Sequence, residues 1–327
     1  DSAFAALDNS GSVQAWGDPG RGGTLIDRWD TDLPVDLSNV KTIFSNEGAF
    51  VALKHDNTVR VWGDGGSGGS LAHSNANNFT NNNNVKTIFS TESAFAALDK
   101  TGTVQAWGNQ YAGGDLSSNL INVKTIFSNQ RAFAALKQDD TVQSWGNSTH
   151  GGHLSSNLIN VKTIFSTDSA FAALDNSGSV EAWGDPSGGG SGVPVDLSNV
   201  KTIFSSGNAF AALKNDGTVQ AWGDPSGGGA APSDLSNVKT IFSNQRAFAA
   251  LKGDGSIEVW GDPSGGGAAP STLNNLKMFC QGERYKRGHS RYHPDYDELY
   301  YNDEYSNLYN PIIDLTEELI SPVVFVG

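Results

Sequence analysis

The stretch VKTIFSTDSAFAALDNSGSVEAWGDPSGGG, residues 161–190, recurs with few changes along most of this 327-residue chain. The dipeptide Trp-Gly begins seven times, with successive spacings of 46, 45, 38, 38, 39 and 38 residues. The hexapeptide VKTIFS occurs six times, each time 22 residues before a repeat tryptophan. The segment between these two motifs therefore has a fixed length, and the length variation lies in the connector that follows Trp-Gly.

Each repeat is predicted to consist of short β-strands. VKTIF and AFAAL are short apolar runs, and TVQAW alternates with the period of a strand. Between the second and third runs stand NDGT, NSGS or KTGT, which are typical of tight hairpin turns. Three or four such strands cannot bury both of their faces alone, but repeats stacked around a ring bury one another. The sequence predicts an all-β, seven-bladed β-propeller with its repeat tryptophans wedged between blades.

The two ends of the repeat region are complementary. The first repeat begins near AFAAL (Ala3–Leu7) and lacks its VKTIFS strand. The segment LKMFCQG, residues 276–282, has the pattern of that strand and follows the last Trp-Gly at the usual connector length. We expect residues 276–281 to pair beside Ala3–Leu7 and to close the ring, which removes free sheet edges. The alternative is a fragment of a longer array, and Asp1 is either a processed terminus or a truncation point.

The pattern V-x-x-I … AL-x-x-DG-x-V-x-x-WG … GG-x-L resembles the RCC1 repeat, named for the regulator of chromosome condensation. The resemblance covers residues 1–282 in seven copies. It implies a seven-bladed propeller that binds proteins through one face, in a family that includes guanine-nucleotide exchange factors, ubiquitin-ligase accessory domains and a β-lactamase inhibitor. The chain departs from the exchange factors because it has no recognisable wedge hairpin and its repeats are more uniform. This departure argues against exchange activity.

The copies differ at a triplet between the first two predicted strands. Variable loops on a uniform scaffold are where binding specificity resides. These loops are expected to ring one mouth of the channel and to mix carboxylates with arginines, although ordinary solvated turns are the simpler interpretation. The candidate partner-binding residues at this position are Glu47, Glu92, Arg131, Asp168 and Arg246.

A second variable region is the long connector after each of the first two Trp-Gly motifs. The first connector contains Ile26, Arg28 and Trp29, and the second contains the Asn-rich run HSNANNFTNNNN. Trp29 is the one tryptophan outside the repeat motif, and a loop tryptophan among charges resembles a binding hot spot. Alternatively, Trp29 folds back over the edge of its own blade. A carbohydrate-binding propeller is a weaker hypothesis that rests on these same residues.

Residues 283–327 form a Tyr-rich C-terminal extension in which the repeat pattern is absent. The extension is basic at its start and acidic in its middle. Asn310 and Pro311 suggest the N-cap and first position of a short helix. One face of this helix would carry Ile312, Leu315 and Leu319. We expect the extension to dock, either on its own ring or on a partner.

Composition restricts the function classes. The net charge of −14 disfavours binding to nucleic acid, whose phosphates are also negative. The single cysteine, Cys280, allows no intrachain disulfide, and the compartment stays open. The His150/His153 and His289/His293 pairs lack a matched set of further ligands, and the glycine runs lack the Lys-Ser/Thr of a phosphate loop. We therefore predict no enzyme activity, no metal and no cofactor.

The leading hypothesis is a non-catalytic protein-interaction module or scaffold, such as a peripheral or accessory subunit of a larger assembly. Its partners would be proteins whose identity the sequence does not give. No apolar run reaches transmembrane length, which leaves peripheral association with a membrane complex open. The alternative hypothesis is a regulator of enzyme activity, either a guanine-nucleotide exchange factor or an enzyme inhibitor.

Overall fold

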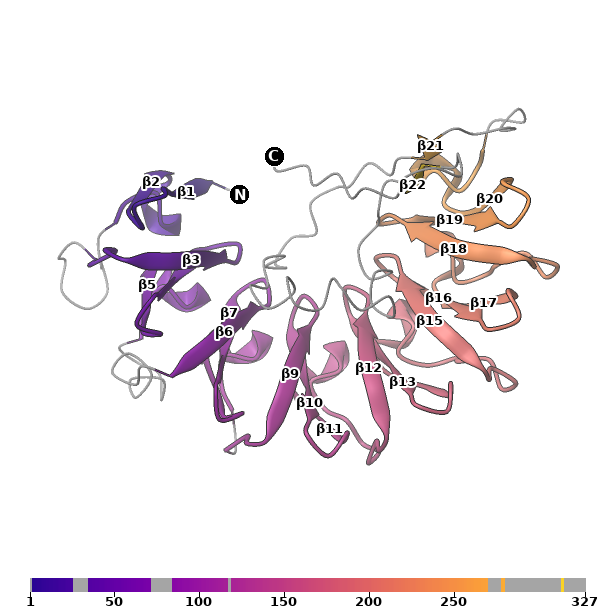
Figure 1. Ribbon diagram of the computed structural model, residues 1–327, viewed down its shortest axis with the longest axis horizontal. Helices are drawn as coiled ribbons and strands as arrows, with labels where there is room; N and C mark the ends of the chain where they lie inside the picture. The colour runs from indigo at the N-terminus through magenta and orange to yellow at the C-terminus, as the bar shows by residue number, and fades with distance from the viewer. Residues whose placement is uncertain are drawn as a thin grey trace. The chain divides into compact units, whose positions relative to one another are not determined.

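The computed structural model describes residues 2–25, 35–71, 84–116 and 119–269, together with the short strands 278–279 and 313–314. Regular structure in these ranges consists of β-strands and 3-10 turns (Figure 1). In every repeat after the first, three antiparallel strands are neighbours in chain order. Seven such sheets, counting the two-stranded first one, confirm the predicted all-β, seven-bladed fold.

The predicted strands are all present in the seven repeats. The first repeat contributes β1 (Ala3–Leu7) and β2 (Val13–Gly17). The later repeats contribute β3 (Val40–Ser45), β4 (Ala49–Lys54), β5 (Val59–Gly63), β6 (Val85–Ser90), β7 (Ala94–Asp99), β8 (Val104–Gly108), β9 (Val123–Ser128), β10 (Ala132–Lys137), β11 (Val142–Gly146), β12 (Val161–Ser166), β13 (Ala170–Asp175), β14 (Val180–Gly184), β15 (Val200–Ser205), β16 (Ala209–Lys214), β17 (Val219–Gly223), β18 (Val238–Ser243), β19 (Ala247–Lys252) and β20 (Ile257–Gly261).

A 3-10 turn follows the Trp-Gly strand of each repeat and begins after an Asp or Asn cap. The seven turns are η1 (Pro19–Arg21), η2 (Gly65–Ser67), η4 (Gln110–Ala112), η5 (Ser148–His150), η6 (Pro186–Gly188), η7 (Pro225–Gly227) and η8 (Pro263–Gly265). A glycine pair follows each turn, and two different constraints require it. Gly113 has a φ of 95° and faces the Phe133 ring of the next blade, while a Cβ on Gly114 would lie 2.4 Å from the Gly108 carbonyl. The fixed distance from tryptophan to this pair is therefore steric in origin.

The described residues fall into two compact units, with the chain passing from one to the other at Ser169–Ala170. In the first unit the first strands of successive blades, β3, β6, β9 and β12, are neighbours in that order (Figure 1). In the second unit β13 neighbours β15, and β15 neighbours β18. The predicted domain boundary at residue 282 lies outside the described residues and stays a prediction.

Tryptophan joins one blade to the next. In each blade a phenylalanine of the second strand stacks on the tryptophan of the third, with ring centroids 5.0 to 5.6 Å apart. The indole N–H also donates to the first glycine of the pair in the preceding blade, at 2.9 to 3.1 Å. These bonds are Trp62 to Gly22, Trp107 to Gly68, Trp145 to Gly113, Trp222 to Gly189 and Trp260 to Gly228. The predicted position of tryptophan between neighbouring blades is confirmed for these five.

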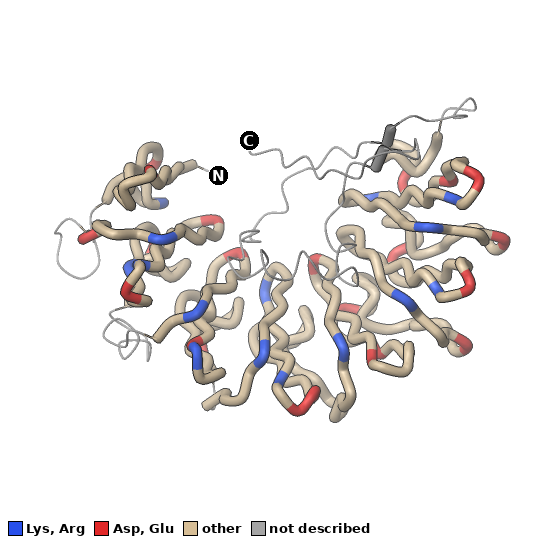
Figure 2. The backbone as a smooth tube through the Cα atoms, viewed as in Figure 1, with Lys and Arg blue, Asp and Glu red and all other residues tan. Residues whose placement is uncertain are grey.

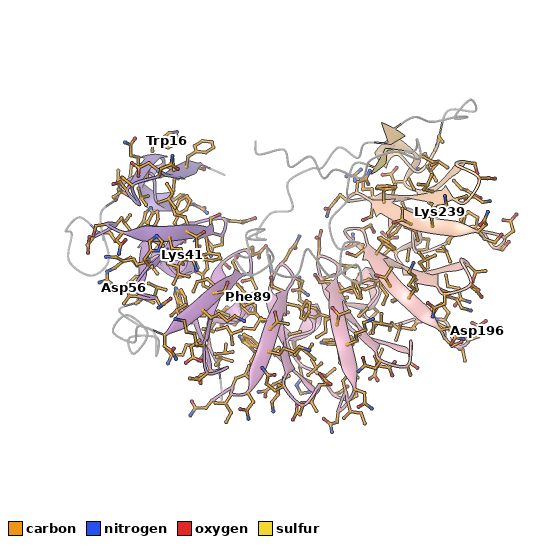
Figure 3. All side chains as sticks on the ribbon, in the orientation of Figure 1. Trp16, Lys41, Asp56, Phe89, Asp196 and Lys239 are labelled. Atoms are coloured by element: carbon orange, nitrogen blue, oxygen red, sulfur yellow. The ribbon has the colours of Figure 1, made fainter. Side chains whose placement is uncertain are left out.

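The first blade differs because part of it is exposed. Phe4 and Trp16 stack on each other like their counterparts, but they are 62% and 52% exposed, whereas Trp107 is 0% exposed (Figure 3). Within the described ranges, strand β1 pairs with β2 and has no partner on its other edge, where each later repeat has a third strand. Closure would bring the two units together, so it stays a prediction.

The short strand β21 (Met278–Phe279) lies within the segment predicted to close the ring. It pairs antiparallel with β22 (Ile313–Asp314), with Met278 opposite Asp314. The predicted short helix is therefore wrong at these two positions. An extended backbone there satisfies its polar groups through β21, and an isolated helix of about ten residues is marginal in water. Ile312, Leu315 and Leu319 lie outside the described residues.

Acidification is expected to destabilise the blades. In the hairpin turns, the hydroxyls of Thr58 and Thr218 donate to Asp56 and Asp216 and are the largest cause of the lowered pKa of each carboxyl. These groups are more acidic folded than unfolded, so their contribution is complete above about pH 4 and is lost as the pH falls through their lowered values. Circular dichroism melts at pH 7, 4, 3 and 2 should show a falling midpoint. An Asp56→Asn/Asp216→Asn variant should show a smaller fall, and an identical fall would contradict this assignment.

Candidate protein-interaction site

The variable triplets connect the first and second strands of each blade. The first unit contains the loops 46–48, 91–93, 129–131 and 167–169, which we call the loop belt. The second unit contains loops 206–208 and 244–246. The three positions of a triplet have separate roles, which the structure makes clear.

The first residue of each triplet builds the loop. The Asn129 side-chain oxygen accepts from the N–H groups of Arg131 and Ala132 at 3.0 and 2.8 Å. Its amide nitrogen donates to the carbonyl of His150, at the end of η5, at 2.7 Å. Thr91 bonds in the same way through its hydroxyl, which donates to the Ala112 carbonyl at 2.9 Å. Short polar side chains at this position fix the loop against the 3-10 turn, so this position is structural.

The second residue of each triplet links neighbouring blades through the backbone. The N–H of Glu47 donates to the carbonyl of Glu92 at 3.1 Å, and the N–H of Glu92 donates to Gln130 at 2.9 Å. The N–H of Gln130 continues the chain to the carbonyl of Asp168 at 3.2 Å. In the second unit Gly207 donates to Gln245 in the same manner, at 2.9 Å. The loop belt is thus a continuous hydrogen-bonded series that presents one second-position residue per blade.

Gln130 was not among the residues predicted from the sequence. It occupies the same position as Glu47 and Glu92, and its backbone bonds on both sides complete the series. An alignment of the triplets by position would have identified it. The candidates at this position were selected by charge, and the Gln130 side chain is neutral.

Arg131, at the third position, connects two loops of the belt. Its Nε lies 2.5 Å from an Oε1 oxygen of Glu92 in the preceding blade. The Arg131 side chain is 48% exposed and that of Glu92 is 19% exposed. A charge-assisted contact of this kind orients the guanidinium, while the exposed part stays accessible to a partner.

Arg246 belongs to an identical Asn-Gln-Arg triplet but binds a different group. Its Nη1 lies 3.2 Å from an Asp262 carboxylate oxygen within its own repeat, and its side chain is 62% exposed. The equivalent of Asp262 in the repeat of Arg131 is the neutral Asn147. The loop preceding that of Arg246 has Gly207 where the other has a glutamate. Each arginine therefore pairs with a carboxylate that the other repeat lacks at the equivalent position.

The structure brings together four of the predicted residues, Glu47, Glu92, Arg131 and Asp168, in the first unit. Arg246 occupies the equivalent position in the second unit. Ile26, Arg28 and Trp29 lie in the segment 26–34, outside the described residues, and their predicted role stays a prediction.

The described part of the chain contains no group of three His, Cys, Asp or Glu side chains placed to hold a metal ion. His150 lies in η5, where its Nδ1 is 3.0 Å from the Thr149 hydroxyl. Within the same ranges, no helix has the length and apolarity needed to cross a membrane.

Repeated three-stranded antiparallel blades, indole bonds between them and variable loops between first and second strands define a repeat protein of the β-propeller class. No family model matches the sequence, and no curated protein matches it. Among solved structures, the ectodomain of the Physcomitrella patens receptor kinase CR4 aligns with a TM-score of 0.42 at 15% identity, covering 80% of this chain and 70% of that chain. Prp20p from Saccharomyces cerevisiae, described with binding to Gsp1p and histones, gives 0.41 at 15% identity and 80% of both chains. The CRINKLY WD40 ectodomain of Arabidopsis thaliana ACR4 gives 0.40 at 14% identity, covering 79% and 90%.

Proposed function

We propose that this protein is a non-catalytic protein-interaction module whose loop belt contacts a protein partner. The observation that carries the proposal is the backbone series from Glu47 through Glu92 and Gln130 to Asp168. It holds four variable side chains on loops whose own conformations are fixed by hydrogen bonds. A preorganised loop loses less conformational entropy on binding than a mobile one, which favours affinity.

The charge of the loop belt indicates the kind of partner surface. Its second and third positions carry the three carboxylates of Glu47, Glu92 and Asp168 and the one guanidinium of Arg131, so the formal charge is −3 + 1 = −2. An acidic patch attracts a surface rich in lysine and arginine and orients it during encounter. The partner is therefore a protein with a basic docking surface, consistent with a role as a peripheral or accessory subunit.

Charge reversal at the loop belt is expected to weaken partner binding at least tenfold, about 1.4 kcal/mol. A Glu47→Lys/Asp168→Lys variant introduces the wrong charge without removing the structural first-position residues. The partner would be recovered by cross-linking and affinity purification from the native source, purified, and titrated against full-length protein. The matched control is Asp115→Lys/Asp234→Lys, which makes the same change in net charge at exposed positions outside the belt.

Equal weakening by the belt variant and the control would show that net charge alone matters and would contradict the proposal. The alternative of enzyme regulation is tested with the same preparations. Acceleration of nucleotide release from small GTPases, or inhibition of a β-lactamase, that is lost in the belt variant would replace the scaffold role with a regulatory one. Substrate turnover lost on the same substitutions would overturn the non-catalytic assignment.

A further inference from the structure

A row of lysines crosses the first unit on a different part of the blades. The second residue of each VKTIFS strand is a lysine, and Lys41, Lys86, Lys124 and Lys162 stand on β3, β6, β9 and β12. The blue segments on these four strands in Figure 2 mark them. Lys41, Lys86 and Lys124 are exposed, and Lys162 is half-buried. We call these four residues the lysine row.

A β-bulge accompanies the row. Val40 pairs with Lys54 and Thr42 pairs with Leu53, so Lys41 is an extra residue that has no pairing partner in β4. The same shift skips Lys86 in β6 and Lys124 in β9. A bulge re-aims the side chain of its extra residue and leaves it outside the strand ladder. Lys41, Lys86 and Lys124 therefore occupy the same bulge position in three successive blades.

The surroundings of the row carry both signs of charge. The strands themselves carry no carboxylate, since each reads VKTIFS. The valine before each bulge pairs with a residue of the second strand: Lys54 in the first of these blades, Asp99 in the next and Lys137 in the third. Lys54 is buried and forms an ion pair with Asp36 at 3.0 Å, so within the described ranges Lys137 adds the free positive charge among these three. The Asp99 carboxylate is buried and accepts hydrogen bonds from the backbone of Thr101 and Thr103 in its own turn, at 2.8 Å each. These bonds hold the carboxylate toward its own hairpin turn, where it keeps its negative charge.

The hairpin of the preceding blade lies beside each lysine. The N–H of Val40 donates to the Gly11 carbonyl at 3.0 Å, and that of Val123 donates to Gly102 at 2.9 Å. The carboxylates of these turns accept hydrogen bonds from their own serines and threonines, as Asp8 does from Ser10 at 2.6 Å. Among the described residues, Lys41, Lys124 and Lys162 take part in no ion pair.

The spacing of the row indicates which anions fit it. Stacked sheets lie about 10 Å apart, so successive blades present a lysine roughly every 10 Å. An extended peptide rises about 3.3 Å per residue, so every third residue advances by the same distance. A nucleic acid strand presents a phosphate about every 3.4 Å, so every third phosphate would fit the same spacing. We favour a peptide because the proposed function already supplies a protein partner, and single-stranded DNA is therefore one arm of the test.

We propose that the lysine row binds an extended acidic segment of a protein partner, with Asp or Glu at every third residue, lying across β3, β6, β9 and β12. The proposal rests on the proposed function and adds a second contact of opposite charge. The row and the loop belt stand at opposite ends of the first strands, and a strand of six residues spans about 17–20 Å. A partner with a basic surface and an acidic extended segment could therefore engage both.

The test uses full-length protein and a fluorescent 12-residue peptide with glutamate at every third position among Gly and Ser. A second peptide of the same composition has its glutamates contiguous. Anisotropy titrations at 50 mM NaCl are expected to show the spaced peptide binding at least fivefold more tightly, with affinity falling at 300 mM NaCl as surface charge pairs are screened. Equal affinity for the two peptides would overturn the proposed register.

The variant Lys41→Gln/Lys124→Gln is expected to lose at least tenfold in affinity for the spaced peptide. The matched control Arg21→Gln/Arg60→Gln also loses two positive charges from the first unit and should bind as the unchanged protein does. Circular dichroism melts verify that both are folded, and if the first variant does not fold, Lys124→Gln alone gives the same comparison. Loss in both variants, or tighter binding of a 12-nucleotide single-stranded DNA than of the peptide, overturns the proposal.

The Glu47→Lys/Asp168→Lys variant separates this proposal from the proposed function. It should bind the spaced peptide no more weakly than the unchanged protein does, because it alters only the loop belt. If it loses the partner but keeps the peptide, both proposals stand. If peptide binding is absent from every protein while the belt variant still loses the partner, the lysine row fails and the loop belt survives.

Discussion

Replacing Trp107 with alanine is expected to lower the free energy of unfolding by about 3–5 kcal/mol, the usual cost of removing a buried tryptophan. The Trp107 side chain is completely buried, stacks on Phe95 at 5.6 Å and donates to the Gly68 carbonyl at 3.0 Å. Its loss leaves a cavity between two blades and a buried carbonyl without its donor. Chemical denaturation followed by circular dichroism measures the change.

Two matched substitutions test the reason for this loss. Trp107→Phe keeps most of the packing but removes the indole donor, and it should cost less than Trp107→Ala. Trp16→Ala removes the same side chain from the first blade, where it is 52% exposed in the first unit. If the array stays open, this substitution should cost much less than Trp107→Ala. Equal and small losses at both positions would contradict the assignment of tryptophan as the residue that joins blades.

Removing residues 276–327 is expected to weaken cooperative unfolding and to promote aggregation, whereas removing residues 284–327 should leave the blades folded. The reason is the unpaired edge of β1, since the segment 276–281 has the pattern of the strand that every later repeat places there. Thermal unfolding and light scattering of the two truncated proteins give the comparison. Equal stability of the two truncated proteins would contradict the prediction that residues 276–281 close the ring.

Trp16 gives this prediction a second readout. Each of the five interblade indole bonds runs to the first glycine of the pair in the preceding repeat, so closure by the same rule would assign the Gly266 carbonyl to Trp16. Among the described residues, a Cβ on Gly266 meets Asn244 alone, at 3.6 Å, whereas the equivalent Gly228 faces Phe248 at 2.5 Å. Iodide quenching of the total tryptophan fluorescence should increase on removal of 276–327, and this increase should be absent in proteins that carry Trp16→Phe. The shorter truncation also tests the extension, because losing residues 284–327 is expected to weaken partner binding.

The sequence predicted the blades well because their determinants are local. VKTIF, AFAAL and TVQAW carry strand patterns, the Asp-Gly and Ser-Gly turns favour hairpins, and seven copies reduce the chance of error. The same local reasoning was wrong at Ile313–Asp314, where a helical pattern gave way to pairing with β21. There a distant strand competed with a short helix, and no local pattern shows that competition.

Repetition in the sequence by itself determined that this protein is an array of antiparallel blades joined by tryptophan. Its tertiary structure decided which equivalent residues differ in their contacts. Arg131 and Arg246 belong to identical triplets, yet one bonds to the preceding blade and the other to its own cap, because the carboxylates around them differ. In the sequence, Lys41 is simply the polar residue of an alternating strand. Its role as the extra residue of a β-bulge depends on the pairing of its strand with β4. Local patterns fix strands and turns, whereas charge partners and register depend on residues that only folding brings together.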